Sequence, residues 1–212
     1  MDLHQFTVNP FYENTYLAVE GEAAVLFDPG FFDENEFRQF EQKLSKSGAG
    51  LRAVVLTHAH VDHIIGLKKV KSRFDVPVYL HRDDMFFWEN YVTQAGMFGL
   101  EVEPFDFTPT HLPPQSGWDE TGISFDVLFT PGHAPGHLSF YRSQEGLVIA
   151  GDTLFQGSIG RTDLYKGDMD TLAKSIKQQL YTLPDETIVY PGHGPATDIG
   201  TEKQSNAFVR ME

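Results

Sequence analysis

The chain has 212 residues, 41% of them hydrophobic, and a formal net charge of −14 at pH 7. This length is sufficient for one well-buried core and short for two ordinary domains, so we expect a single domain over residues 1–212. The acidic balance argues against nucleic-acid partners, which require clustered lysine and arginine. The sequence contains no cysteine, which excludes disulfides and thiolate metal sites, so that any metal must be held by nitrogen and oxygen.

The first residues, 1–8, lack the basic and long apolar stretches of an export signal. No apolar run approaches the ~20 residues of a membrane span. We therefore expect a cytoplasmic protein without a membrane partner, and the sequence leaves its oligomeric state open.

Hydrophobic periodicity and turn residues predict the elements of the first half. The expected elements are strands 3–8, 14–19 and 23–27, helix 34–45, strand 53–56, helix 64–74 and strand 76–80. The first three strands suggest an antiparallel opening, and the later alternation of strand and helix is typical of α/β folds.

Between residues 82 and 118 the periodicity fails and aromatic residues are frequent. Such an excursion is an aromatic cluster that covers a sheet or, for residues 85–107, a lid or an interface. After it, the expected elements are strands 123–129, 137–141 and 147–150, helix 169–180 and strand 187–190. Two halves of similar plan fit two sheets packed face to face with helices outside.

The strongest functional signal is His58-Ala59-His60-Val61-Asp62-His63, directly after the apolar run 53–56. Because alternate residues of a strand point to one face, we expect His58 and His60 to reach one metal together. Asp62 and His63 lie past the expected strand end and can turn toward a second metal. The alternative is a polar loop with solvated histidines.

Three further strand ends carry a metal-capable residue directly after a glycine: Gly132-His133, Gly151-Asp152 and Gly192-His193. Glycine allows a sharp turn and a close approach, so these loops are expected to fold around one point. The candidate ligands are then His58, His60, Asp62, His63, His133, Asp152 and His193.

Seven ligands divide naturally into two sites that share one carboxylate, because an aspartate can bridge two cations ~3.5–4 Å apart. Asp152 is the expected bridge. The first metal is expected at His58, His60 and His133, and the second at Asp62, His63 and His193.

Open coordination positions for water mark a catalytic site. A water shared by two metals has its pKa brought toward ~7, which provides a bridging hydroxide and predicts hydrolysis. Two divalent metal ions are therefore expected, with zinc first and iron or manganese as alternatives.

These motifs resemble those of the metallo-β-lactamase superfamily of binuclear hydrolases. The resemblance rests on Asp28, the cluster 58–63, His133, Asp152 and His193 with their neighbours. It implies an α/β fold, an αββα sandwich of two facing mixed β-sheets with helices on the outer faces, and the same division of ligands. Residues 130–137 and 151–163 are similar to the glyoxalase II-type branch, which implies a thioesterase for a glutathione thioester such as S-lactoylglutathione.

Catalytic roles follow for two residues. Asp62 is expected to orient the attacking hydroxide or to accept its proton. Arg161 stands where the resembled branch has a basic residue that contacts substrate. It either binds a substrate carboxylate or an oxyanion, or it forms an ordinary ion pair with Asp163 or Asp168.

Asp28 is interpreted as a residue that orients a ligand imidazole, with a strand-end turn as the alternative. His137 is interpreted as a core histidine with satisfied hydrogen bonds and is left out of the ligand set.

Other activities of the same superfamily stay open. Gly160-Arg161-Thr162-Asp163 also resembles iron-dependent glutathione persulfide dioxygenases, which use one iron held by two histidines and an aspartate. Lactonases and other ester hydrolases share the ligand set. The complete set of seven ligands favours the binuclear hydrolase.

Overall fold

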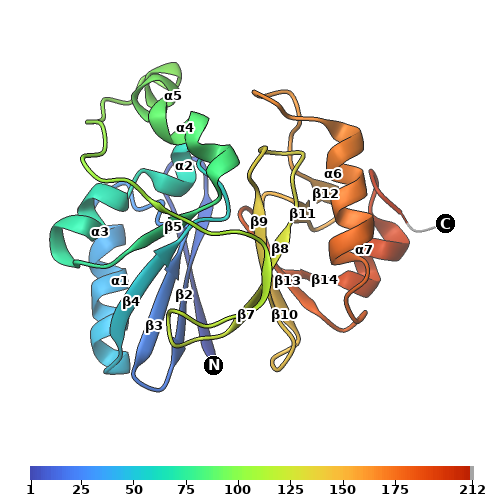
Figure 1. The fold of residues 1–212 in the computed structure, drawn as a ribbon, viewed down its shortest axis with the longest axis horizontal. Helices are drawn as coiled ribbons and strands as arrows, with labels where there is room; N and C mark the ends of the chain where they lie inside the picture. The colour runs from blue at the N-terminus through green and yellow to red at the C-terminus, as the bar shows by residue number, and fades with distance from the viewer. Residues whose placement is uncertain (211–212) are drawn as a thin grey trace. The chain divides into compact units, whose positions relative to one another are not determined.

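The computed structural model describes residues 1–210, which form two compact units (Figure 1). Unit 1 consists of Met1–Leu112 and Asp119–Ile123, and unit 2 consists of Pro113–Trp118 with residues 124–210. A single domain over residues 1–212 stays a prediction. Among the helices of residues 1–210, none has both the length and the apolar character that a membrane crossing requires.

Unit 1 is built on a six-stranded mixed sheet. Its elements are β1 (Asp2–Val8), β2 (Glu13–Glu20), β3 (Ala23–Phe27), α1 (Glu34–Ser47), β4 (Gly50–Val55), α2 (Val61–Ile64), α3 (Leu67–Arg73), β5 (Val78–Leu80), the 3-10 helix η1 (Arg82–Asp84), α4 (Met85–Glu89), α5 (Tyr91–Met97) and β6 (Thr110–His111). The strands lie in the order β1-β2-β3-β4-β5-β6. β1, β2 and β3 are antiparallel, and β3 to β6 are parallel.

The parallel strands define the edge where polar residues gather. Because their carboxyl ends meet at one edge, Asp28 after β3, residues 56–63 after β4 and residues 81–84 after β5 follow each other there. β2 runs antiparallel to β3, so its first residue, Glu13, starts at the same edge. The sheet thus assembles a site from four separate segments.

Local signals explain α1. Asp33 forms a capping box with Glu36, and the helix ends at Gly48, whose φ of 72° is left-handed. The residues at helical spacing, Phe37, Phe40 and Leu44, are buried. The helix predicted over residues 34–45 is thus confirmed and extends to Ser47.

The prediction of one continuous helix over residues 64–74 is wrong, because the structure has two helices there. α2 ends at Ile64 and α3 begins at Leu67. Between them, the amide of Gly66 donates a hydrogen bond to the carbonyl of Pro29 at 2.8 Å. A Cβ on Gly66 would lie 2.6 Å from that oxygen, so the chain passes too closely for any other residue and the helix breaks there.

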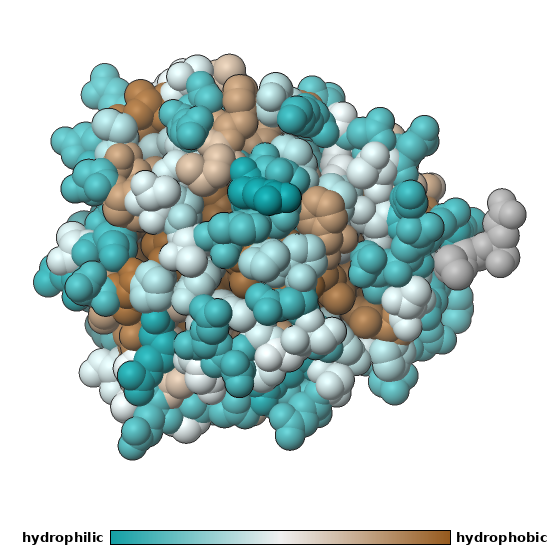
Figure 2. Space-filling model, in the orientation of Figure 1, coloured by the Kyte–Doolittle hydropathy of each residue, from teal (hydrophilic) through white to brown (hydrophobic). Residues whose placement is uncertain are grey.

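The segment predicted to be irregular contains α4, α5 and short strands, and its aromatic residues form a cluster within unit 1. The ring of Phe105 stacks on Trp88 at 4.3 Å and on Tyr91 at 4.4 Å between centroids. The exposed apolar residues of the segment are Phe86, Val92, Met97 and Phe98. A role as a lid or an interface stays a prediction. On the face drawn in Figure 2, hydrophilic residues are spread over the whole surface, with hydrophobic residues showing between them.

Unit 2 is built on a second six-stranded mixed sheet. Its elements are β7 (Gln115–Trp118), β8 (Phe125–Phe129), β9 (Leu138–Arg142), β10 (Leu147–Gly151), β11 (Leu154–Phe155), β12 (Ser158–Ile159), α6 (Met169–Ser175), the π-helical turn η2 (Ile176–Leu180), β13 (Ile188–Pro191), β14 (Thr197–Asp198) and α7 (Ile199–Ser205). The order is β14-β13-β10-β9-β8-β7, and β11 and β12 form a separate hairpin. Only β10 and β13 are parallel among these described pairs.

Helices cover one face of this second sheet (Figure 1). Leu172 of α6 and Ile176 of η2 pack with Val148 of β10 and Val189 of β13 in one buried core cluster. The helix predicted over residues 169–180 is confirmed in extent, although its last turn is π-helical. The parallel β10 and β13 end at the same edge, so Asp152 and His193 follow their carboxyl ends there.

Candidate metal centre

The histidine cluster of unit 1 lies in a loop and a short helix. β4 ends at Val55, and residues 56–60 are not a strand, so the expected alternation of His58 and His60 on a strand is wrong. His60 is instead the residue before α2, which carries Asp62 and His63. The strand ends one residue before the apolar run 53–56 does, and the amide of Thr57 bonds Asp28 at the end of the neighbouring β3.

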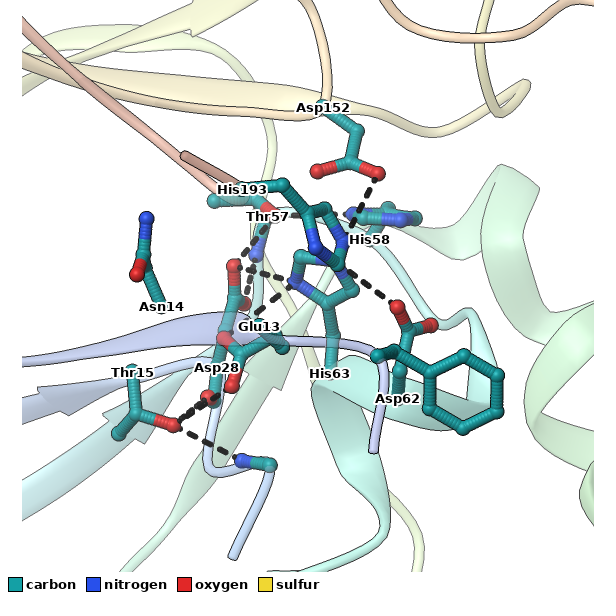
Figure 3. Close-up of polar contacts among 12 residues, drawn as sticks. Glu13, Asn14, Thr15, Asp28, Thr57, His58, Asp62, His63, Asp152 and His193 are labelled. Carbon is teal, nitrogen blue, oxygen red and sulfur yellow. Dashed lines mark hydrogen bonds and ion pairs between the residues drawn. The ribbon is translucent and has the colours of Figure 1, made fainter. Parts of the chain in front are cut away.

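Asp28 is the acceptor that organises this loop (Figure 3). Its Oδ1 accepts from the amide of Thr57 at 2.7 Å, and its Oδ2 accepts from Thr57 Oγ1 at 2.6 Å and from His63 Nδ1 at 3.1 Å. Asp28 also has a φ of 47°, a left-handed conformation that is uncommon for a residue with a side chain. The backbone turn and the carboxylate thus act together, in line with the interpretation that Asp28 orients a ligand imidazole.

The hydrogen-bond partners of His58 and His63 determine which ring nitrogen of each carries the proton. Since a carboxylate only accepts, the Nδ1 of His63 carries the proton. Thr57 gives its single hydroxyl proton to Asp28, so its oxygen accepts from His58 Nδ1 at 2.9 Å. His58 and His63 are therefore both held with a lone pair on Nε2, which is the form that binds a metal. Both side chains are buried.

Three residues that the sequence did not single out support the same loop. Asp84 of η1 accepts from the amide of Ala59 at 2.8 Å, and Gln94 of α5 donates to its carbonyl at 3.2 Å. Asn9 donates to the backbone oxygen of Asp62 at 3.0 Å. Polar residues of this kind are common in every sequence, and only the fold reveals that they converge on one loop.

Glu13 is a fourth such residue. It is fully buried at the start of β2, and burial raises the pKa of its carboxyl well above the usual range. One of its oxygens lies 2.8 Å from Thr15 Oγ1, and the other lies 3.7 Å from His63 Nδ1. Thr15 in turn bonds the carbonyl of Asp28 at 2.7 Å, so Glu13 belongs to the polar network behind the imidazole of His63.

Unit 2 brings three predicted ligands together. Asp152 Oδ2 lies 3.5 Å from His133 Nε2 and 3.6 Å from His193 Nε2. His133 and Asp152 are buried, and His193 is about a quarter exposed. One carboxylate oxygen between two imidazole nitrogens is the arrangement expected of a shared ligand.

The hydrogen bond behind His133 again fixes its tautomer. Its Nδ1 lies 2.8 Å from the carbonyl oxygen of Arg161, which can only accept, so the lone pair is on Nε2. Gly160 makes this possible, because a Cβ there would overlap the carbonyl oxygen of Asp152 and lie 3.0 Å from His133 Nδ1. The chain thus passes directly behind two ligands.

The expected tight turns at glycine occur at two of the three motifs. Gly132 has a φ of 130°, and a Cβ there would collide with the backbone of Leu172. Gly151 has a φ of 49°, and its carbonyl accepts from the amide of Gly192 at 2.8 Å. These backbone conformations place the following residue of each motif, His133 or Asp152, at the strand end.

Arg161 adopts the ion pair that was considered as the alternative to substrate binding. Its Nε and Nη2 donate to the two carboxylate oxygens of Asp163, each at 2.7 Å, and both side chains are exposed. These hydrogen bonds lower the pKa of Asp163 to about 2. The backbone of Arg161 positions His133, whereas its side chain reaches solvent.

The predicted site residues thus fall into two sets. His58, His60, Asp62 and His63 belong to unit 1, and His133, Asp152 and His193 belong to unit 2. The first set follows the parallel strand β4, and Asp152 and His193 follow the parallel strands β10 and β13, whereas His133 follows β8, whose pairings are antiparallel. Across the two sets, His58, His63 and His133 have a fixed tautomer with Nε2 available. Nitrogen and carboxylate donors of this kind fit divalent zinc, iron or manganese.

Residues 8–193 match the family described as the metallo-beta-lactamase superfamily. Among similar curated proteins, the probable metallo-hydrolase YqgX of Bacillus subtilis is 40% identical over 99% of this chain and 98% of its own length. The hydroxyacylglutathione hydrolase GloC of Haemophilus influenzae is 36% identical over 100% of both chains.

Solved structures show the same fold. BLEG-1 B3 metallo-beta-lactamase superposes with a TM-score of 0.86 at 35% identity, covering 98% of this chain and 99% of that chain. TTHA1623 in a di-iron-bound form gives a TM-score of 0.86 at 39% identity, with coverages of 97% and 100%. ETHE1 from Myxococcus xanthus gives 0.77 at 27% identity, with coverages of 98% and 84%. The predicted metallo-β-lactamase fold, with two mixed sheets and helices, is confirmed.

Proposed function

Because the chain belongs to the metallo-β-lactamase superfamily, we propose that it is a metal-dependent thioesterase that hydrolyses a glutathione thioester such as S-lactoylglutathione. Two findings support the proposal. The protein GloC, which is similar over its whole length, is a hydroxyacylglutathione hydrolase. The imidazoles of His58, His63 and His133 are held by hydrogen bonds in the tautomer that metal binding requires. This second observation carries the assignment of a metal-dependent activity.

In this proposal two divalent ions bind, with Asp152 as the shared ligand. His58, His60 and His133 would hold one ion, and Asp62, His63 and His193 the other. Zinc is the expected metal, and the di-iron form of TTHA1623 makes iron the first alternative. When bound, such ions supply Lewis-acid polarisation of a carbonyl and a hydroxide nucleophile near neutral pH.

The chain's own residues have two tasks besides ligation. Asp62 is partly exposed, with its Oδ2 3.9 Å from His63 Nε2, and in the proposal it accepts the proton of the attacking water. Arg161 binds a carboxylate of the glutathione part, for which its bidentate pair with Asp163 is the geometric precedent. The substrate carboxylate would compete with Asp163 for the guanidinium group.

A second candidate is a glutathione persulfide dioxygenase that uses a single iron. It is favoured by the motif Gly160-Arg161-Thr162-Asp163 and by the similarity to ETHE1 from Myxococcus xanthus. Lactones and other esters are further substrates within the same proposal of hydrolysis. A cytoplasmic location and the absence of membrane and nucleic-acid partners stay predictions from the sequence.

The test is the rate of S-D-lactoylglutathione hydrolysis by zinc-loaded protein, followed by loss of thioester absorbance, with a chelated sample as the blank. Asp152→Ala should lose bound zinc and activity, because the variant lacks the shared carboxylate. His111→Ala is the matched control, since it removes an exposed histidine of unit 1.

Absence of turnover in a wild-type sample that carries zinc would refute the thioesterase. Oxygen uptake by iron-loaded protein with glutathione persulfide would then identify the dioxygenase. If Asp152→Ala kept both zinc and activity, the assignment of the shared ligand would be wrong.

A further inference from the structure

The motif Thr130-Pro131-Gly132-His133-Ala134-Pro135-Gly136-His137 contains two histidines, and the proposed metal centre uses only the first. His137 immediately precedes β9 and is fully buried in unit 2. A buried histidine close to a proposed ligand needs an explanation, because its two ring nitrogens must both find partners.

The Nε2 of His137 accepts a hydrogen bond from the backbone amide of Asp152 at 3.0 Å. A backbone amide can only donate, so Nε2 holds a lone pair in this contact and the proton is on Nδ1. His137 thus has the same tautomer as His133, but its Nε2 bonds the backbone of Asp152, whereas the Nε2 of His133 lies 3.5 Å from Asp152 Oδ2. One histidine of the motif contacts the carboxylate of Asp152, and the other holds its backbone.

The proton on Nδ1 fixes the direction of a longer chain. Nδ1 lies 3.0 Å from Thr130 Oγ1 and 3.1 Å from Thr153 Oγ1. Ser139 gives its proton to the carbonyl of Ala150 at 3.4 Å, so Thr130 donates to Ser139 Oγ at 2.9 Å and accepts from His137. These side chains are all fully buried.

This chain of hydrogen bonds begins at the amide of Asp152 and ends at the carbonyl of Ala150. It therefore encloses Gly151, the residue of positive φ where β10 ends. Thr130 follows the end of β8, and His137 and Ser139 lie at the start of β9. Side chains from two neighbouring strands therefore hold the backbone on both sides of the turn by hydrogen bonds. The carboxylate of Asp152 points from this turn toward His133 and His193, at 3.5 and 3.6 Å.

We propose that His137 is a positioning residue for the shared metal ligand: its neutral ring fixes the backbone of Asp152, and thereby the carboxylate that the two ions would share. The inference rests on the proposed metal centre. It gives the second histidine of the motif a role that differs from ligation, and it explains why a ring with an acceptor at Nε2 and a donor at Nδ1 is needed there.

Two substitutions test the contacts of the two ring nitrogens of His137 one at a time. His137→Gln places an amide oxygen near the position of Nε2, and so keeps the acceptor for Asp152 but not the contact with Thr130. His137→Asn places an amide near the position of Nδ1, and so keeps the threonine contact but leaves the amide of Asp152 without its acceptor. Both variants replace the ring with an amide, and asparagine is one methylene shorter than glutamine, so the loss of packing is measured separately on the metal-free proteins.

The readout is zinc stoichiometry and affinity, measured by competition with a chromophoric chelator, together with the thermal stability of the metal-free variants. His137→Asn should weaken zinc binding roughly ten- to a hundredfold, the usual effect of losing a residue that orients a ligand. His137→Gln should stay within a few-fold of the wild-type zinc affinity, and the unfolding temperatures of the metal-free variants show how much stability each one has lost. Equal zinc affinity in the two variants would reduce His137 to a structural role and overturn the inference.

A second measurement needs no variant. In ¹⁵N-labelled wild-type protein, the Nε2 of His137 should be unprotonated and should show a coupling through the hydrogen bond to the amide of Asp152. A proton on Nε2 would overturn the inference even if neither variant folds. If wild-type protein bound no metal at all, the proposed metal centre would fail instead, and the hydrogen bond could still be observed.

Discussion

Substitution of Asp28 by asparagine tests whether fixed imidazole tautomers support metal binding. The change replaces one carboxylate oxygen with an NH2 group and alters almost no volume. If Oδ1 keeps its bond to the amide of Thr57, the new NH2 group takes the place of Oδ2, which accepts from both Thr57 Oγ1 and His63 Nδ1. Two acceptor contacts then become donor contacts.

The metal-free variant can adapt. His63 can move its proton to Nε2 and accept from asparagine with Nδ1, and Thr57 can accept from the same NH2 group and donate to His58 Nδ1. Each contact around position 28 then pairs a donor with an acceptor again, so we expect little change in the stability of the metal-free protein. The adaptation nevertheless leaves His58 and His63 with a proton on the nitrogen that should bind the metal.

Zinc binding must reverse that adaptation. In the metal-binding tautomer, the Nδ1 proton of His63 faces the NH2 group of the asparagine. The variant then lacks the hydrogen bond to a charged acceptor that the wild type has, which is worth about 1.5–3 kcal/mol. That energy corresponds to an affinity loss of roughly ten- to 150-fold. The coupled change at His58 acts in the same direction, so Asp28→Asn should lose at least about tenfold in zinc affinity.

Chelator competition on metal-free wild type, Asp28→Asn and Thr57→Ser measures this loss. Thr57→Ser is the matched control, because it keeps the hydroxyl that links Asp28 to His58. Thermal unfolding of the metal-free samples shows whether the fold is unchanged. Wild-type zinc affinity in a folded Asp28→Asn protein would refute the tautomer argument.

Two further predictions concern positions away from the ligands. Glu202 is buried and accepts hydrogen bonds from the amide of Gly157, from Thr197 and from Asn206. Glu202→Gln should therefore place an NH2 group against a donor and lower the free energy of unfolding in urea by roughly 1–3 kcal/mol. Gln204→Ala, on the exposed side of α7, is the control, and equal stability of both variants would contradict the reasoning. The pKa of Asp163 falls from 3.8 to about 2 through its hydrogen bonds with Arg161, so the contribution of this pair to stability is complete above pH 3.8 and is lost as the pH falls through about 2. Carbon NMR of the Asp163 carboxyl group should show this low pKa in wild type and a value near 3.8 in Arg161→Gln, and identical titrations would refute the pairing.

The bounds of several helices and strands were predictable from local sequence patterns. The strand at Ala23–Phe27 has the predicted bounds, and α1 differs from its predicted bounds only at the last turn. Both are set by residues within a few positions, namely continuous apolar runs and caps. The break in the helix at Gly66 was not predictable, because its cause is the chain at Pro29, far away in the sequence.

The short elements were missed for a related reason. β11, β12 and β14 have two residues each, which is too short for any periodicity, and their pairing partners decide them. α7 follows β14 directly and begins with Asp198 as its cap. Whether two residues form a strand depends on the neighbouring strand with which they pair more than on their own side chains.

The ligands and the residues that position them differ in the same way. A metal ligand must be one of a few residue types, so histidines and aspartates at strand ends stand out in the sequence. The partners behind them are a carboxylate for His63, a hydroxyl for His58 and a backbone carbonyl for His133. Such acceptors occur everywhere along a chain. Any residue at 161 could supply the carbonyl, whereas Gly160 beside it tolerates no side chain.

This difference has a consequence for relatives of the protein. A chain can keep every predicted ligand and still bind metal weakly if an acceptor behind one imidazole becomes a donor, because the lone pair then moves to the wrong nitrogen. Asp28 is a position where one change of functional group would do this, because it orients the imidazole of His63. A change at His137 would act by another route, through the backbone of Asp152. Among homologues with all seven ligands, the residues at these two positions should therefore separate chains that hold both ions tightly from chains that do not.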